Sequence, residues 1–134
     1  MIGLTRKLIV LLLMHSILCL SALYSSAAEQ TERKWFSYGR DRNTGVEYFY
    51  EKETLTKPSK NLIQMWRRRV FPSGAAQKEI VTFDEIDCVE VRYRSLELSV
   101  TYTDGSTKRF EKVAPWAKVY ANSVEEYLMD EHCK

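Results

Sequence analysis

The sequence predicts a small α+β domain: a mostly antiparallel sheet of about five or six strands, with one C-terminal helix tethered by a disulfide. Three observations support this fold class. Short segments rich in β-branched and aromatic residues alternate with turn residues. A segment with helical periodicity lies near the C-terminus. One cysteine, Cys88, lies in a strand-like segment, and another, Cys133, follows the helix-like one. The length of 134 residues suits one core but hardly two.

The N-terminus has the three parts of a secretory signal peptide. Arg6 and Lys7 precede a long apolar run, which ends in the small residues of Ser25–Ala28. The predicted organisation is a signal peptide at 1–28, a flexible lead-in at 29–33 and a domain at 34–134. We therefore expect an exported protein, located in the periplasm or on the outer cell surface.

Two other N-terminal arrangements share features with this segment. Residues 8–28 carry no charge and are long enough to span a bilayer, so an uncleaved membrane anchor remains the main alternative. A lipid anchor on Cys19 is disfavoured, because Leu18 precedes it where a lipoprotein signal needs a small residue. After cleavage we expect no stable membrane insertion.

The charge balance argues against nucleic-acid binding. The whole chain has 20 basic and 18 acidic residues. Cleavage would remove two of the basic ones, Arg6 and Lys7, and leave a formally neutral domain. General nucleic-acid binding needs a dominant cationic face, which a neutral domain does not predict.

The two remaining cysteines predict a disulfide. In an exported chain, Cys88 and Cys133 most simply pair with each other. On the chain-entropy model this crosslink contributes about 4 kcal/mol. A zinc site formed by Asp87, Cys88, His132 and Cys133 is the alternative. Export favours oxidation and no Cys-x-x-Cys pair occurs, so we expect no metal and no cofactor.

The first half of the domain reads as three strands. Residues 34–38 and 46–50 predict a hairpin, joined by turn residues that include Gly45. Pro58 interrupts the pattern, because proline cannot donate a ladder hydrogen bond. Residues 62–71 predict the third strand. The segment 75–84 fits a short helix and a strand equally well, and the sequence leaves it open.

The second half contains the strand on which we expect the fold to be organised. Residues 86–94 alternate as one central strand, and the alternation then changes phase, which predicts a bulge at Arg94–Ser95. Asp104–Gly105 predicts a hairpin turn, with 107–111 as the returning strand. Ser123 and Glu126 have the spacing of a helix capping box.

The order of these segments and residues along the chain resembles that of one family, surface-adhesin protein E. Its members are small exported bacterial domains with an antiparallel sheet and a helix. The residues that carry the resemblance are Trp35, Tyr48–Tyr50, Trp66, Arg68, Ile86–Cys88, Arg92–Arg94, Tyr102, Asp104–Gly105, Trp116, Ser123, Glu126 and Cys133. The chain departs from the family pattern at Glu51–Leu55 and at Ala121–Asn122, both at loop entries. No binding residue of an adhesin can be matched to a position here.

Three arginines form the candidate binding face. The run Arg67–Arg69 suggests a contact with a polyanion such as lipopolysaccharide or glycosaminoglycan. On a strand, however, Arg68 would point to one face and its neighbours to the other, so we favour a solvated or edge-guarding role. Arg92 and Arg94 share one face, where we expect ion pairs with Glu90, Asp87 or the acidic helix in preference to ligand binding. The tryptophans and tyrosines could form a recognition surface, although we expect most of them in the core.

The resemblance implies a non-enzymatic binding module of the envelope, whose ligand is a protein or a component of the envelope or extracellular matrix. The alternative is a small periplasmic inhibitor or accessory factor that docks on an enzyme or a secretion component. A sheet edge could also pair two copies into a homodimer. We find no catalytic residues: adjacent carboxylates such as Glu125 and Glu126 diverge on a helix, and no Ser/His/Asp arrangement is present.

Overall fold

The computed structural model describes residues 33–134, and Lys34–Lys134 form one compact unit. The expected signal peptide, its alternatives at Cys19 and 8–28, and most of the lead-in lie outside the described residues. The strands are β1 (Trp35–Arg40), β2 (Glu47–Glu51), β3 (Thr56–Ser59), β4 (Leu62–Val70), β5 (Gln77–Asp87), β6 (Arg92–Tyr102), β7 (Thr107–Phe110) and β8 (Ala117–Lys118), and the helix is α2 (Val124–His132).

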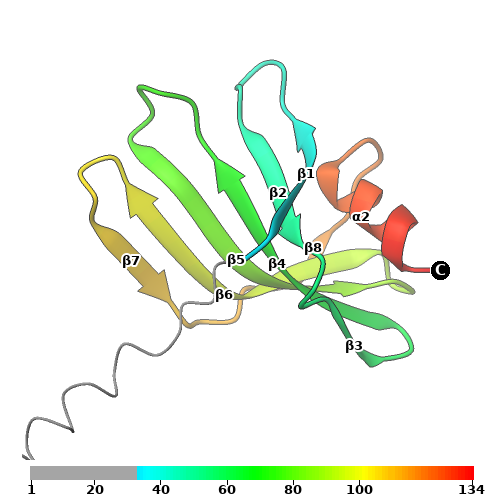
Figure 1. Cartoon of the computed structure of the whole chain (residues 1–134). Coiled ribbons are helices and arrows are strands. Elements are labelled where there is room, and N and C mark those ends of the chain that lie inside the picture. The colour runs from blue at the N-terminus through cyan, green and yellow to red at the C-terminus, as the bar shows by residue number, and fades with distance from the viewer. Residues whose placement is uncertain (1–32) are drawn as a thin grey trace, which may run out of the picture. The chain divides into compact units, whose positions relative to one another are not determined.

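All eight described strands belong to one antiparallel sheet (Figure 1). The long strands β4, β5 and β6 form its centre. The outer edge of β4 is shared by β2 and β3, and that of β6 by β7 and β8. The antiparallel sheet with a C-terminal helix is confirmed, but the expected count of five or six strands is wrong.

The extra strands are short and lie at the edges. β3 contains Pro58, which we expected to break the pattern, yet all four of its residues are exposed on an edge. There the missing amide hydrogen of proline removes no ladder bond. β8 has two residues, and it forms only because it pairs with Arg92 and Tyr93 of β6. Neither strand has a periodic pattern of its own.

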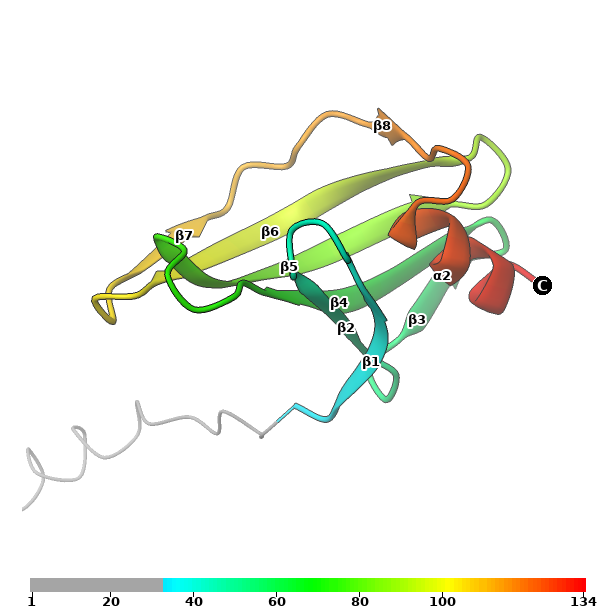
Figure 2. The ribbon, with the colours of Figure 1, turned by 90° about the horizontal axis from the view of Figure 1, so that it is seen from above.

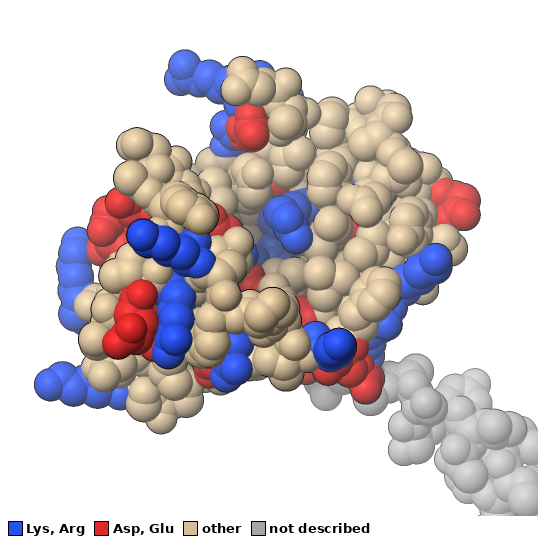
Figure 3. Space-filling model, turned by 180° about the vertical axis from the view of Figure 1, so that it is seen from behind, with Lys and Arg blue, Asp and Glu red and all other residues tan. Residues whose placement is uncertain are grey.

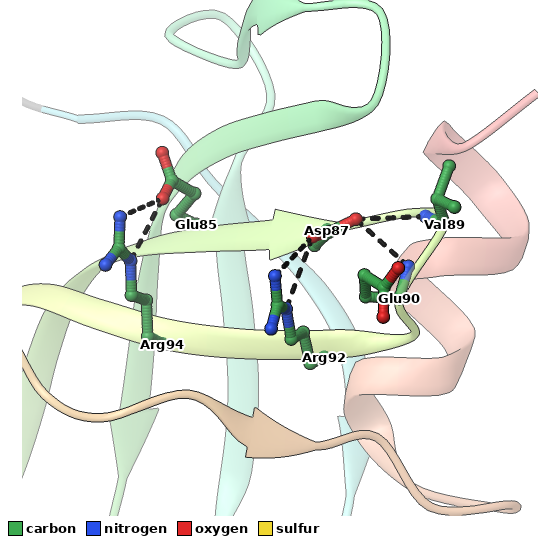
Figure 4. A network of polar contacts seen from close by, with 6 residues as sticks. All are labelled: Glu85, Asp87, Val89, Glu90, Arg92 and Arg94. Atoms are coloured by element: carbon green, nitrogen blue, oxygen red, sulfur yellow. Dashed lines mark hydrogen bonds and ion pairs between the residues drawn. The ribbon is translucent and has the colours of Figure 1, made fainter.

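The central strand expected at residues 86–94 is instead a hairpin. β5 ends at Asp87 and β6 begins at its cross-strand partner, Arg92. The carboxylate of Asp87 accepts hydrogen bonds from the backbone amides of Val89 and Glu90, both at 3.1 Å (Figure 4). Val91 closes the turn with φ of 51°, which is unusual for a β-branched residue. The turn therefore forms without glycine or proline.

The open segment 75–84 belongs mostly to β5, which starts at Gln77. The register slips between Ser95 and Glu97 of β6, so the extra residue is Leu96. The bulge thus lies one residue beyond the predicted Arg94–Ser95, and it accounts for the change of phase.

Helix α2 packs on one face of the sheet, across the end that carries the β5–β6 turn (Figure 2). Ser123 caps it as expected, because its hydroxyl oxygen accepts a hydrogen bond from the amide of Glu126 at 3.1 Å. The carboxylate of Glu126 accepts from the amide of Asn122, one residue earlier than a capping box predicts. Among residues 33–134, no helix combines the length and apolar composition needed to cross a membrane.

The hydrophobic core lies between α2 and the sheet. Leu128 of the helix is fully buried, and alternation along β4 brings Ile63 and Met65 to the same layer. Tyr50 of β2 and Ile86 of β5 complete the cluster. These residues form the core because their strands alternate with period two while the helix presents one side.

The Cys88–Cys133 disulfide is confirmed. It joins the β5–β6 turn to the residue that follows α2, with the two Cα atoms 5.6 Å apart. The crosslink closes a loop over a sequence separation of 45 residues, so it restrains the unfolded chain strongly.

Candidate binding face

Alternation gives the sheet two faces of different composition. Ile63, Met65 and Arg67 of β4 point toward α2, and we call this face the helix side. Trp66 and Arg68 point the other way. We call this opposite face the tryptophan side, because Trp35 and Trp116 contact its arginines. All three tryptophans are half-buried, and none belongs to the core cluster.

Arg68 lies on the tryptophan side, where its guanidinium group forms an ion pair and also packs against aromatic rings. Its Nη2 atom lies 2.7 Å from Oε2 of Glu79 on the neighbouring strand β5. The guanidinium also lies over two rings, 5.8 Å from the centroid of Trp35 and 5.9 Å from that of Phe49. Arg68 is therefore a paired cation that holds the β1–β2 hairpin against β4.

Arg92 and Arg94 lie on the same face, at the other end of the strands (Figure 4). Arg94 donates from Nε and Nη2 to Oε1 of Glu85, at 3.0 and 2.7 Å. Arg92 donates in the same way to Oδ2 of Asp87, at 3.3 and 3.2 Å. Both acids are almost fully buried, so the two arginines supply the hydrogen bonds that their burial requires.

Trp116 joins these two ion pairs into one cluster. The guanidinium carbon of Arg94 lies 4.3 Å from its ring centroid, and that of Arg92 lies 4.7 Å away. The tryptophan follows the β6–β7 hairpin and precedes β8, whose pairing with β6 brings the segment back over this end of the sheet. The sequence offered no signal for this contact, because Trp116 is more than 20 residues beyond either arginine.

The three predicted arginines therefore share a face but form two separate clusters. Arg68 lies opposite Val81 of β5, whereas Arg94 lies opposite Glu85. Four residues along a strand correspond to about 13 Å. Trp66 and Phe83 lie between the clusters, with ring centroids 5.0 Å apart.

The hydrogen bonds of the β5–β6 turn also stabilise the ionised form of Asp87. The amide of Glu90 is the main cause of the lowered pKa of this carboxyl, followed by the amide of Val89 and the guanidinium of Arg92. Desolvation opposes these hydrogen bonds but does not outweigh them. The turn and the Arg92 ion pair thus depend on one charged side chain.

A second polar network, on the helix side, was not anticipated. Arg67, expected to be solvated, is buried between Asp84 of β5 and Glu125 of α2. Its Nη1 atom donates to Glu125 at 2.7 Å, and its Nε donates to Asp84. Thr82 also donates to Asp84, at 3.1 Å. Alternation did predict that Arg67 and Arg68 take opposite faces, but nothing in the sequence marks acids so far away as its partners.

Arg67 remains charged in this environment. Burial alone would lower its pKa, but the charge of Asp84, with further contributions from Tyr38 and Glu125, raises the pKa above its usual value. Tyr38 reaches the network through a bulge in β1, and its ring stacks on that of Tyr127 at 5.9 Å. The network and this stack fasten the first half of α2, while the disulfide fastens its end.

The zinc alternative is not supported, because the sulfurs of Cys88 and Cys133 are bonded to each other. His132 is half-buried beside the ring of Tyr50, and burial lowers its pKa. Within residues 33–134, no group of three or more His, Cys, Asp or Glu side chains is placed to hold a metal ion.

A comparison of the chain with protein-family models, with curated proteins and with solved structures finds no match. The assignment of function therefore depends on the residues of the chain itself and on their geometry.

Proposed function

We propose that this chain is an exported, non-enzymatic binding module of the bacterial envelope that recognises a protein ligand through its tryptophan side. The proposal agrees with the resemblance to surface-adhesin protein E. It rests on one observation above all: half-exposed tryptophans lie on the same face as three arginines whose positions are held by ion pairs.

Tryptophan and arginine are the residue types that dominate binding energy at protein interfaces. Trp116 is packed against Arg92 and Arg94, and Trp35 against Arg68. Because these side chains are already ordered by their neighbours, binding loses little of their conformational entropy. The face therefore has both the composition and the rigidity of an interaction surface.

The ion pairs also indicate the kind of ligand. Glu79, Glu85 and Asp87 each compensate one arginine, so the face offers no surplus of positive charge at these positions. A polyanion would gain little there. A folded protein fits this face better than a polyanion does, because it can cover the aromatic surface and form hydrogen bonds with the exposed edges of the guanidinium groups.

The disulfide is compatible with export, because such bonds persist in oxidising compartments. A location in the periplasm or on the cell surface remains part of the proposal. Proteolysis of intact cells separates these two: a surface module would be removed, whereas a periplasmic one would be spared.

The direct test measures binding of the purified, oxidised domain to a panel of extracellular-matrix proteins. Trp116→Ala and Arg94→Ala are expected to weaken any saturable binding at least tenfold. The matched control is Phe110→Ala, which removes an aromatic side chain that is 48% exposed on the helix side. If all three variants bind like the natural sequence, the tryptophan side is not the binding face.

A second candidate, a docking factor for an envelope enzyme or secretion component, is favoured by the β5–β6 turn. Val89 and Val91 are 62% and 43% exposed at its tip. The turn is held rigid by the carboxylate of Asp87 and by the disulfide. An exposed, pre-ordered apolar tip suits insertion into a partner's cleft. Loss of binding in Val89→Asp, with Trp116→Ala unaffected, would favour this candidate.

A further inference from the structure

A half-buried arginine without an acidic partner lies on the helix side. β4 and β6 together carry five arginines, and four of them form ion pairs: Arg67, Arg68, Arg92 and Arg94. The fifth, Arg69, is half-buried, and its side chain has neither an ion pair nor a hydrogen bond to any residue of the described chain. Partial burial without a counter-charge costs a cation solvation free energy. An anion that reached Arg69 would recover part of that cost.

Arg69 lies where α2 no longer covers the sheet. The helix packs over the end near the β5–β6 turn, and the other end of the long strands extends beyond it (Figure 2). In the sheet register, Arg69 of β4 lies between Tyr48 of β2 and Ile80 of β5. The same row continues across the sheet to Val100 of β6 and then to Lys108 of β7. We call this part of the face the outer half of the helix side.

The outer half of the helix side is apolar and basic. Its members are Tyr48, Arg69, Ile80, Val100, Lys108 and Phe110. This set contains two cations and no acid. Seen from behind, the molecule has a hollow in which Lys or Arg atoms lie among mostly uncharged ones, with some Asp or Glu atoms at its edges (Figure 3). A cation on an apolar, concave surface is the usual composition of a site for a small organic anion.

The inner end of the same face limits the charge of such an anion. Asp84 and Glu125 outnumber Arg67 by one charge, so this network repels a second negative charge nearby. Tyr93 lies close enough to feel the charges of both this network and Arg69. Burial raises the pKa of its hydroxyl, and the charges of Glu125 and Asp84 raise that pKa further. The charges of Arg67 and Arg69 lower it. A singly charged carboxylate is therefore better matched to Arg69 than a doubly charged phosphate.

We propose that the outer half of the helix side binds the carboxylate of a small organic acid with an apolar body. The guanidinium of Arg69 donates to the two carboxylate oxygens in the fork geometry that such pairs adopt. The apolar part of the acid lies against Ile80 and Val100, with Phe110 at the rim. This site lies on the face opposite the tryptophan side, so a test of one proposal does not decide the other.

The test uses phenylacetate as the probe and follows the purified, oxidised domain by NMR. Saturable shifts are expected at the Arg69 side-chain Nε–Hε group and at Ile80 and Val100. Phenylacetamide, which keeps the ring and loses the charge, is expected to bind at least tenfold more weakly. Phenyl phosphate is expected to bind more weakly as well. The assignment to a carboxylate is overturned if either compound binds as tightly as phenylacetate.

Two variants locate the site. Arg69→Gln is expected to weaken phenylacetate binding at least tenfold. Arg109→Gln, which removes an exposed arginine from the tryptophan side, is expected to leave binding unchanged. If Arg69→Gln does not fold, Arg69→Lys serves instead, since it keeps the charge but loses the fork. The absence of saturable shifts in the natural sequence, or equal binding by both variants, overturns the site.

Discussion

Arg67 and Glu125 are 58 residues apart in the chain, yet they join the centre of the sheet to the C-terminal helix, with Nη1 and Oε1 2.7 Å apart. On its other side the same guanidinium pairs with the fully buried Asp84. One side chain thus forms ion pairs with acids from two elements.

Removal of Arg67 should destabilise the fold strongly. In Arg67→Met the apolar stem is largely kept, but Asp84 and Glu125 lose their common cation in a buried place. We expect a loss of about 3–5 kcal/mol in the free energy of unfolding, measured by urea denaturation. Arg109→Met, an exposed control, should change it by less than about 0.5 kcal/mol. Equal effects of the two substitutions would show that the network contributes little.

Reduction of the disulfide should lower stability without changing the core. Closing the loop between Cys88 and Cys133 contributes about 4 kcal/mol on the chain-entropy model. Urea denaturation with and without reductant measures the difference, and a thiol assay of the purified domain without Cys19 should detect no free sulfhydryl. Detection of reactive thiols at Cys88 and Cys133 in the untreated protein would contradict the crosslink.

Arg94 and Trp116 should be coupled energetically. A guanidinium 4.3 Å from the ring centroid at a partly exposed site is expected to contribute about 0.5–1 kcal/mol. A double-mutant cycle of Arg94→Ala and Trp116→Ala, read by denaturation, isolates this term. Arg68 with Trp116 provides the uncoupled control pair, because the two lie in different clusters.

Stability should fall in acid partly through Asp87. Its folded-state pKa is lowered from 3.8 by the amides of Glu90 and Val89 and by Arg92. A carboxyl with a lowered folded pKa stabilises the fold above its unfolded pKa, and that contribution is lost as the pH falls through the folded pKa. Asp87→Asn should therefore lose less stability than the natural sequence between pH 5 and pH 2.

The matched control for this pH dependence is Asp130→Asn, on an exposed position of α2. It should retain the full acid-induced loss of stability. Denaturation at a series of pH values, with an NMR titration of the Asp87 carboxyl carbon, measures both effects. An Asp87 pKa at or above 3.8 in the folded protein would refute this explanation.

Several local features could be predicted because they depend on neighbouring residues. Ser123 caps α2 because a hydroxyl at that position can accept from the amide three residues later. Asp104 and Gly105 turn the β6–β7 hairpin, with φ of 85° at the glycine. The hairpin at Cys88–Val91 was missed, because its turn depends on the carboxylate of Asp87 and on a positive φ at a valine.

The candidate face was predictable only in part. Alternation placed Arg92 and Arg94 together and separated Arg68 from Arg67. It could not place Trp116 over the first two, because that contact depends on the two-residue pairing of β8 with β6. The expectation that most aromatic residues lie in the core failed for the tryptophans, since aliphatic residues and Tyr50 fill the space under α2.

The antiparallel sheet with a C-terminal helix, the pairing of Cys88 with Cys133 and the alternation of each long strand could be predicted from the sequence, because they follow from residue type and local spacing. The pairing of each acid with its arginine and the extra strands at the edges became visible in the folded chain alone. Those outcomes depend on how distant segments come together, and a guanidinium such as Arg67 pairs with whatever carboxylate the packing of α2 brings within reach.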